Sequence, residues 1–205
     1  MNGLKIAART DYLVESSARC LLFLTAAKSN DREGRPFVGE ILDHGKEWKF
    51  RSWIGAEPKG FSIMPSTIRI GPNELYTIVR HRDSDGRNLR AYRSPDNGRH
   101  WQREIDPVDE LGAGNPPCLI QLSDKTLCVT YGVRAVPYRI CAKISRDRGK
   151  TWGPELVIRD DGSSPDLGYP RAILRPDGKV VVVYYFSDAT TGPERYIAAS
   201  IWTPH

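Results

Sequence analysis

The chain has 205 residues, 40% of them hydrophobic and 27% charged, with 18 glycines, 15 prolines and a formal net charge of +5 at pH 7. This composition excludes a disordered chain, a collagen-like chain and a small disulfide-rich scaffold, and the length suffices for a buried core. No apolar run approaches the roughly 18 residues of a membrane-spanning helix, and no run of like charges predicts a nucleic-acid-binding arm. The first residues contain no apolar signal region, and the sequence leaves the compartment and the oligomeric state open.

The cysteines and histidines predict neither a metal site nor a cofactor. The four cysteines lie in apolar, β-like runs, without a C-x-x-C pair or a histidine at metal-ligand spacing: Cys20, Cys118, Cys128 and Cys141. Buried thiols are therefore favoured over disulfides or metal ligands. The sequence also contains no glycine-rich phosphate loop that opens a helix.

A short motif recurs at a constant spacing along the chain. Residues 94–101 and 145–152 share the pattern S-x-D-x-G-x-x-W, and residues 41–48 keep its Asp, Gly and Trp but have Ile in place of Ser. A second marker recurs in phase with it, because a proline precedes an apolar segment in three successive repeats: Pro65, Pro117 and Pro170. Two independent markers with one period predict four repeats of about 52 residues each.

Each repeat is predicted to contain four short strands. We expect residues 4–8 to form the outer strand of a preceding unit, and the following units to span approximately 9–55, 62–107, 115–160 and 168–203. In the second unit the strands are expected at 66–70, 75–81, 89–94 and 102–105, and in the third at 118–122, 126–131, 139–145 and 155–159. The apolar run Val180–Phe186 has the length and composition of a buried strand. No segment has sustained helical periodicity, so the sequence predicts an all-β, single-domain fold over residues 1–205 with about sixteen strands.

Four-stranded units with this period are typical of the blades of a β-propeller. The repeated motif would then form the tight turn between the third and fourth strands of a blade. Its Ser and Asp side chains can bond the backbone of the turn, its Gly supplies a positive φ, and its Trp packs against the blade. We therefore predict a structural role, and no catalytic one, for the motif residues Asp43, Asp96, Asp147, Trp48, Trp101 and Trp152.

This motif is the Asp-box, and with it the chain resembles the sialidase (neuraminidase) superfamily of BNR-repeat β-propellers. The resemblance covers essentially all 205 residues and implies four-stranded blades of the sialidase type. Propellers of that family normally have six blades, whereas this chain supplies about four. The resemblance therefore implies a C-terminal portion, or a shortened product, that lacks roughly two N-terminal blades. Three Asp-boxes are specific for the fold and much less specific for an activity.

The resemblance also implies a site at the blade ends opposite the Asp-boxes. Sialidases hold the carboxylate of their substrate with three arginines, whose planar guanidinium groups match a carboxylate. Their nucleophile is a tyrosine paired with a glutamate. In this chain Arg80 resembles the second arginine and Arg134 the third. Tyr169, which is followed by Asp177-Gly178, resembles the nucleophile.

One position departs from the family pattern. The glutamate that would pair with the tyrosine falls on Met64. Either Asp166 or Glu194 then takes that role, or the chemistry is different or absent. Two further residues at the same blade ends are expected to bind substrate: Asn115 and Arg195. The first arginine and the acid/base aspartate of the family would belong to blades that this chain lacks.

Three functions remain open at this stage. The first, which we favour, is a sialidase-like glycoside hydrolase that acts on a terminal anionic sugar such as sialic acid, although this chain alone would be an incomplete catalyst. The second is a non-catalytic propeller that binds a glycan or a protein on the same face, which would explain Met64. The third is another polysaccharide-active propeller, specific for uronic acids. All three predict a carbohydrate or protein partner and involve neither a nucleic acid nor a membrane segment.

Overall fold

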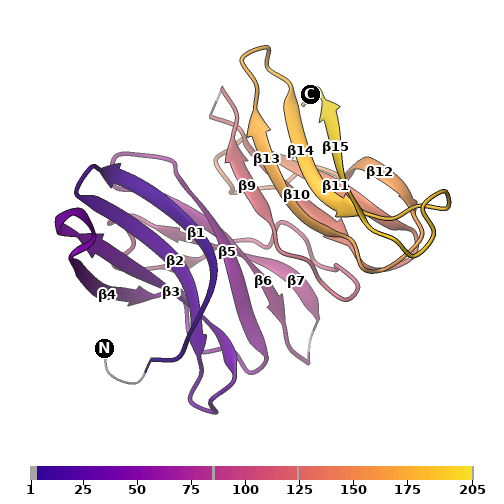
Figure 1. Ribbon diagram of the computed structural model, residues 1–205. Helices are drawn as coiled ribbons and strands as arrows, with labels where there is room; N and C mark the ends of the chain where they lie inside the picture. Colours follow the sequence, from indigo (N-terminus) through magenta and orange to yellow (C-terminus); the bar gives the residue numbers. More distant parts are fainter. Residues whose placement is uncertain (1–3, 85, 124, 205) are drawn as a thin grey trace. The chain divides into compact units, whose positions relative to one another are not determined.

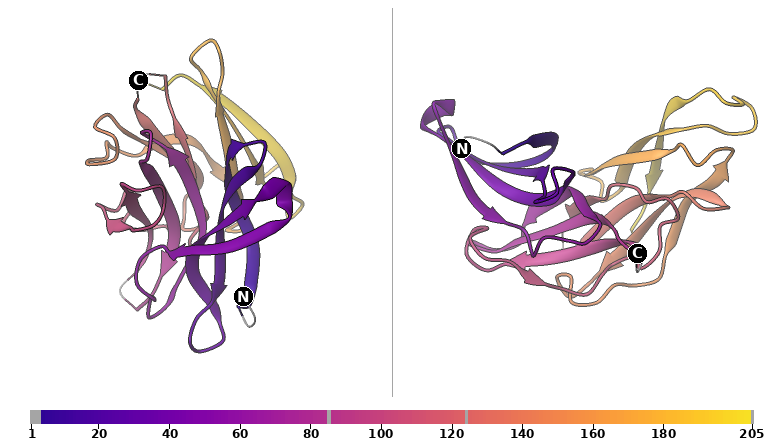
Figure 2. Two further views of the ribbon diagram at one scale, coloured as in Figure 1. Left: turned by 90° about the vertical axis from the view of Figure 1, so that its left-hand side faces the viewer. Right: turned by 90° about the horizontal axis from the view of Figure 1, so that it is seen from below.

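The computed structural model describes residues 4–84, 86–123 and 125–204, and of residues 8–10 only the backbone (Figure 1). In these ranges the chain forms 15 strands and one 3-10 turn, η1 (Asp43–Gly45), so the all-β prediction is confirmed. The strands form four antiparallel sheets in chain order. Each sheet is twisted and its strands follow one another as a simple meander (Figure 2), which is the arrangement expected for propeller blades.

The four sheets have the following strands. The first contains β1 (Ile6–Ser16), β2 (Arg19–Ala27), β3 (Glu33–Leu42) and β4 (Glu47–Trp53), and the second contains β5 (Phe61–Arg69), β6 (Leu75–Arg82), β7 (Arg87–Ser94) and β8 (Gln102–Arg103). The third contains β9 (Cys118–Gln121), β10 (Leu127–Val133), β11 (Tyr138–Ser145) and β12 (Leu156–Gly162). The fourth contains β13 (Gly168–Leu174), β14 (Val180–Phe186) and β15 (Tyr196–Trp202).

The chain divides into two compact units. Unit 1 comprises Met1–Gly86 and Arg90–Glu104, and unit 2 comprises Arg87–Leu89 and Ile105–His205. In unit 1, Leu21, Phe23 and Val38 of the first sheet pack against Leu75 and Val79 of the second.

In unit 2, Cys128, Ile140 and Ala142 of the third sheet pack against Val180 and Val182 of the fourth. Burial of apolar surface between two sheets therefore stabilises each unit. Three of the four cysteines are buried and all four are free thiols, as expected, although Cys20 is only half-buried.

The start of the first sheet differs from the prediction. Residues from Ile6 onward belong to β1, which pairs antiparallel with β2 in a register that joins Ile6 to Ala26. The expected separate strand over residues 4–8 is therefore replaced by the beginning of the first sheet's own first strand. The register between β1 and β2 shifts between Ala7 and Asp11, and this irregularity obscures the strand in the sequence pattern.

Two of the three Asp-box turns hold themselves by internal hydrogen bonds. In the second sheet, the Ser94 hydroxyl donates to Asp96 Oδ1 at 2.9 Å and accepts from the Gly98 amide at 2.7 Å. Asp96 Oδ1 also accepts from the His100 amide at 2.9 Å. Gly98 has a φ of +78°, where a glycine is favoured.

The Asp-box of the third sheet repeats these bonds, and the first copy does not. The Ser145 hydroxyl accepts from the Gly149 amide at 2.7 Å, and Asp147 Oδ1 accepts from the Thr151 amide at 2.9 Å. Asp43 instead lies in η1 with a φ of +45° and an exposed side chain. The serine that would bond the turn is replaced by Ile41, which cannot do so.

Candidate functional site

The fourth sheet begins with a distorted segment at the start of β13. Gly168 has a φ of +112° and Tyr169 a φ of +49°, and the register between β13 and β14 shifts between Gly168 and Arg171. A non-glycine residue in this region costs on the order of 1–3 kcal/mol and persists only where its surroundings hold it. Such strain is frequent at functional sites.

Asn115 holds this segment from the third repeat. Its side chain is fully buried. Its Oδ1 accepts from the Tyr169 amide at 2.9 Å, and its Nδ2 donates to the Leu167 carbonyl at 2.8 Å. A Cβ added to Gly168 would lie 2.2 Å from Asn115 Nδ2, so this position requires glycine. Asn115 therefore supports the backbone of this segment through its amide, and its predicted contact with substrate stays a prediction.

Arg134, directly after β10, is anchored on the same segment. Its backbone amide donates to the Leu111 carbonyl at 3.1 Å. In its side chain, Nε and Nη2 donate to the Leu167 carbonyl at 3.1 and 2.9 Å. Nη2 also donates to the Tyr185 hydroxyl at 2.6 Å. One edge of the guanidinium group is thus fixed on a backbone carbonyl, and Nη2 of the same edge also reaches a phenol.

Asp166 receives a donor on each carboxylate oxygen. The Tyr185 hydroxyl donates to Oδ1 at 2.7 Å, and Arg195 Nε donates to Oδ2 at 2.6 Å. Arg134 Nη2 lies 3.9 Å from Oδ1. The side chain of Asp166 is 49% exposed, so the carboxylate is held in place and still reaches solvent.

These contacts set the charge states of the pair. The hydrogen bond from Tyr185 is the main cause that lowers the pKa of Asp166, and the charges of Arg195 and Arg134 add to it. Burial, together with the bond to Asp166, raises the pKa of Tyr185 to about 12. Near neutral pH Asp166 is therefore a carboxylate and Tyr185 a neutral phenol. We call this pair and the four residues around it the Asp166 cluster: Asn115, Arg134, Asp166, Tyr169, Tyr185 and Arg195.

The two remaining residues of the predicted catalytic set lie differently. The ring of Tyr169 is 45% exposed, 5.9 Å from the ring of Tyr185 and 5.9 Å from the Arg134 guanidinium carbon. In the contacts described, its hydroxyl bonds no carboxylate, and the exposed side chain of Glu194 bonds no tyrosine. The phenol–carboxylate pair of this site thus consists of Tyr185 and Asp166. Tyr185 could not be predicted as a site residue from the sequence because it lies in an uninterrupted apolar strand.

Arg80 and Met64 belong to unit 1. Arg80 lies within β6, opposite Ile63 of β5, and its guanidinium carbon is 5.6 Å from the centre of the Phe61 ring. Met64 is buried and has a φ of +55°. Because Arg80 and the Asp166 cluster are in different units, the predicted joint binding of one sugar by Arg80 and Arg134 stays a prediction.

Unit 1 also contains a buried Ser–His–Asp row that the sequence did not reveal. The Ser62 hydroxyl lies 2.8 Å from His81 Nδ1, and His81 Nε2 lies 2.7 Å from Asp83 Oδ2. Ser62 and His81 are both buried. A hydroxyl enclosed in this way cannot approach a glycan, so the row stabilises the end of β6 and does not form a nucleophilic site.

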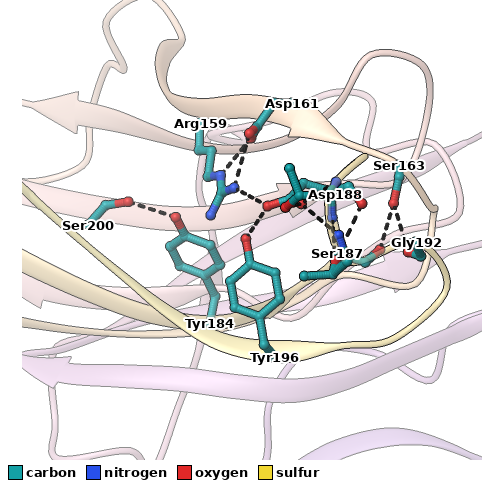
Figure 3. Close-up of polar contacts among 11 residues, drawn as sticks. Arg159, Asp161, Ser163, Tyr184, Ser187, Asp188, Gly192, Tyr196 and Ser200 are labelled. Atoms are coloured by element: carbon teal, nitrogen blue, oxygen red, sulfur yellow. Dashed lines mark hydrogen bonds and ion pairs between the residues drawn. The ribbon is translucent and has the colours of Figure 1, made fainter.

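A second polar network in unit 2 is centred on Asp188, after β14 (Figure 3). Its carboxylate accepts bonds from Arg159 Nη2, the Tyr196 hydroxyl and the Thr190 amide and hydroxyl. The bonds from Thr190 are the main cause that holds the pKa of Asp188 well below its usual range. Arg159 also lies over the Phe186 ring at 4.2 Å. This network fastens the connection between β14 and β15 onto β12, which is a structural role.

Neither a metal centre nor a membrane span is found in the described ranges. No group of three or more His, Cys, Asp or Glu side chains there could hold a metal ion. No helix in this part of the chain is long and apolar enough to cross a bilayer.

The same fold occurs in solved structures of longer chains. A protein of unknown function from Dyadobacter fermentans is 25% identical, with a TM-score of 0.77 over 96% of this chain and 53% of its own. The GH93 α-L-arabinofuranosidase of Fusarium graminearum, solved with arabinobiose, is 16% identical, with a TM-score of 0.67 over 96% and 62% of the two chains. A sialidase of Streptococcus pneumoniae is 14% identical, with a TM-score of 0.63 over 95% and 30%.

These similarities establish the fold as a partial β-propeller of four blades, shared with sialidases and arabinan-degrading enzymes. The chain spans about half the length of the first structure and about three-fifths of the second. A scan against protein-family models found no match, and a search of curated proteins found no significant relative. The expected resemblance to sialidases therefore holds for the propeller fold, and it holds equally for the arabinofuranosidase.

Proposed function

We propose that this chain supplies part of the sugar-binding site of a β-propeller glycoside hydrolase, and that the Asp166 cluster lies in that site. The observation that carries the proposal is the half-exposed carboxylate of Asp166, held between a phenol and two guanidinium groups beside the strained, exposed Tyr169. Propellers of similar fold include an arabinofuranosidase solved with arabinobiose and a sialidase. The fold alone would also suit other functions, so the local chemistry has to decide.

The charge state of Asp166 limits its role. Glycosidases use one carboxylic acid that protonates the leaving group and one carboxylate that acts as nucleophile or base. A carboxyl group whose pKa is lowered by Tyr185 and two arginines suits the second role, because it is ionised near neutral pH. In this proposal the proton donor comes from another residue of the complete propeller.

The sialidase-type form of the proposal makes a narrower assignment. Tyr169 would be the nucleophile, with Asp166 or Glu194 as its base, and Arg134 would bind the carboxylate of a terminal anionic sugar together with Arg80. Two observations support it. Tyr169 is exposed beside Tyr185 and Arg134, and Arg134 directs its described bonds through Nε and Nη2, leaving Nη1 for a ligand. A neutral phenol approaches an anionic sugar with less repulsion than a carboxylate would.

A non-catalytic glycan-binding propeller is the second candidate. It is favoured by Met64, a buried thioether where the sialidase pattern has a carboxylate. Binding needs only the arginines and the aromatic rings of the Asp166 cluster. The uronic-acid-specific form would use the same arginines for a different sugar carboxylate.

Binding and turnover tests separate these functions. We would titrate the 205-residue protein with arabinobiose, N-acetylneuraminic acid and galacturonic acid, and assay activated aryl glycosides of the same sugars. At least one sugar should bind, and Asp166→Asn should weaken it at least about tenfold, the effect of one lost hydrogen bond to a charged group. Asp177→Asn, which changes a carboxylate on the distant turn between β13 and β14, is the matched control and should bind like the wild type.

Tyr169→Phe then decides the nucleophile. If the protein, or the complete propeller, turns over a sialoside, the removal of this hydroxyl should lower kcat by orders of magnitude while the fold survives. Full activity of Tyr169→Phe would remove the sialidase-type assignment. Binding without turnover on any substrate would leave the non-catalytic propeller. A protein that binds none of the three sugars at millimolar concentration would refute the proposal.

A further inference from the structure

We infer that Tyr185 is a positioning residue, whose hydroxyl holds the Asp166 carboxylate in place between Arg134 and Arg195. The inference rests on the proposed function only for its effect on sugar binding, because the arrangement itself is measurable without a sugar. It concerns a residue that neither the motif pattern nor the resemblance identifies.

The hydroxyl of Tyr185 both accepts and donates a hydrogen bond. It accepts a hydrogen bond from Arg134 Nη2 at 2.6 Å and donates one to Asp166 Oδ1 at 2.7 Å. A donor that itself receives a bond from a cation is polarised and donates more strongly. Tyr185 therefore transmits the charge of Arg134, which lies 3.9 Å from the carboxylate, through a short bond.

The hydrogen bonds that link Asp166, Tyr185 and Arg134 end at a backbone carbonyl, that of Leu167. Arg134 is tied to the Leu167 carbonyl through two nitrogens, and the same carbonyl accepts from Asn115. Tyr185 lies on β14 opposite Gly168, so the phenol faces the distorted start of β13. Asp166 precedes this segment by two residues, and its other oxygen is bound by Arg195. Rotation of the carboxylate would break both of its short bonds.

The charged and titratable groups facing Asp166 come from four places in unit 2. They are Arg134 after β10, Tyr169 on β13, Tyr185 on β14 and Arg195 before β15. Of these, Tyr185 has the largest influence in lowering the pKa of Asp166. The pKa of Tyr185 itself is raised to about 12, so it stays a donor throughout the range in which the carboxyl titrates.

Tyr169 provides a matched control. Its ring lies 5.9 Å from that of Tyr185, yet its hydroxyl is not bonded to Asp166 in the described contacts. Tyr185→Phe and Tyr169→Phe each remove one phenolic oxygen from the same small region. Only the first removes a donor from the carboxylate. A general effect of polarity would therefore shift the titration midpoint of Asp166 in both variants, whereas a positioning effect would shift it in Tyr185→Phe alone.

The test is a titration of the Asp166 carboxyl carbon by nuclear magnetic resonance, with Asp166→Asn to assign the signal. We expect its midpoint to move to higher pH in Tyr185→Phe and to stay at the wild-type value in Tyr169→Phe. Arg134→Lys keeps the charge but loses the planar fork that ties Leu167 and Tyr185 together, and should move the midpoint in the same direction. This second variant serves if Tyr185→Phe is poorly folded.

Sugar binding gives the second readout. If the proposed function holds, binding should be lost on acidification at a higher pH in Tyr185→Phe than in the wild type, and at the wild-type pH in the control Asp177→Asn. A wild-type midpoint in both Tyr185→Phe and Arg134→Lys would overturn the inference even if sugars bind. A shift in Tyr185→Phe with no sugar bound at any pH would refute the proposed function and leave the positioning role standing.

Discussion

The second and fourth sheets begin with the same backbone distortion and use it differently. In β5, Met64 has a positive φ, precedes Pro65 and lies within a register shift relative to β6. In β13, Tyr169 has a positive φ, precedes Pro170 and lies within a register shift relative to β14. The repeat therefore reproduces a strained backbone whether a methionine or a tyrosine occupies the position.

The side chains around the two distortions differ in kind. In the second sheet the polar side chains bond one another, because Ser62, His81 and Asp83 form a row with Ser62 and His81 buried. In the fourth sheet a phenol and a carboxylate, Tyr185 and Asp166, meet at the surface. The repeat thus sets the geometry of a blade end, and substitutions at equivalent positions decide whether polar side chains there are buried or reach solvent.

Gly168→Ala should give the largest change in stability. An added Cβ would meet the amide of Asn115 at 2.2 Å, at a φ of +112° that disfavours a side chain. We expect a loss of about 3 kcal/mol in the free energy of unfolding, from strain and overpacking together. In the second sheet Ile63 occupies the equivalent position, so the demand for glycine comes from Asn115 and not from the repeat.

Urea unfolding measures this cost. Gly178→Ala is the control, because that glycine has a φ of +79° and open space around its Cα, so it should lose only about 1 kcal/mol. Equal losses in the two variants would show that the contact with Asn115 does not constrain this segment.

Most of the fold and most of the Asp166 cluster could be predicted from the sequence. The Asp-box and proline markers predicted the all-β fold, the four sheets and most strand positions, since turn residues recur at each repeat. The sequence also selected five members of the Asp166 cluster. Tyr185 was missed because its neighbours Val183 and Tyr184 make it resemble a core residue. The strand register shows that Tyr185 is equivalent to Arg80, which the sequence did select as a candidate. Tyr185 pairs with Gly168 just as Arg80 pairs with Ile63.

The buried row of unit 1 could not be predicted for a different reason. Ser62 and His81 lie on different strands, and they meet only because the β5–β6 register places them opposite each other. A bulge elsewhere in β5 would change this register, and bulges are poorly encoded in a strand pattern. Side-chain pairing across strands therefore needed the structure.

His81→Phe should produce the next largest effect. Phe186 occupies the equivalent position in the fourth sheet, where an aromatic ring is tolerated. In unit 1 the same ring would deprive Ser62 and Asp83 of the imidazole between them. We expect a loss of about 2 kcal/mol, the usual cost of removing a buried hydrogen-bonding group, by urea unfolding. An unchanged stability would mean that the row does not hold the end of β6.

The Asp-box turns offer a comparison by pH. Burial works against ionisation of Asp96, yet hydrogen bonds from His100 and Ser94 lower its pKa to about 2. Bonds from Thr151 lower the pKa of Asp147 to about 2 as well. Both values lie below the ordinary value of about 3.9, so each carboxylate adds stability above that pH, and the gain disappears as the pH falls from about 5 towards 2.

Thermal unfolding between pH 7 and pH 2 tests whether Asp96 and Asp147 stabilise their turns in this way and Asp43 does not. Asp96→Asn and Asp147→Asn should each lower the melting temperature at pH 7 and flatten its decrease in acid. Asp43→Asn should do neither, because the Asp43 carboxylate accepts no bond from an amide of its turn in the described contacts; the Lys46 amide donates to the Asp43 backbone carbonyl instead. A flattened acid limb in Asp43→Asn would show that the first Asp-box forms the same turn in solution as the other two.

Ile197→Lys should have the smallest effect on stability. Ile197 lies on β15 with 72% of its side chain exposed, on the sheet face opposite the one that carries the buried Val182. A lysine there should change the free energy of unfolding by no more than about 0.5 kcal/mol and should reduce self-association measured by light scattering. Val182→Ala, by contrast, should cost about 1–3 kcal/mol because it removes packed methyl groups from the core.

A large loss in the free energy of unfolding of Ile197→Lys would show that the second face of the fourth sheet is covered. The run Val180–Phe186 is apolar at every position, a pattern typical of a strand covered on both faces, whereas the structure buries Val180, Val182, Tyr184 and Phe186 and leaves Val183 40% exposed. If lysine at position 197 destabilises the protein as much as Val182→Ala, this second face is covered in solution. The fourth sheet would then be an internal blade, as the third sheet is where Ile140 packs beneath the fourth.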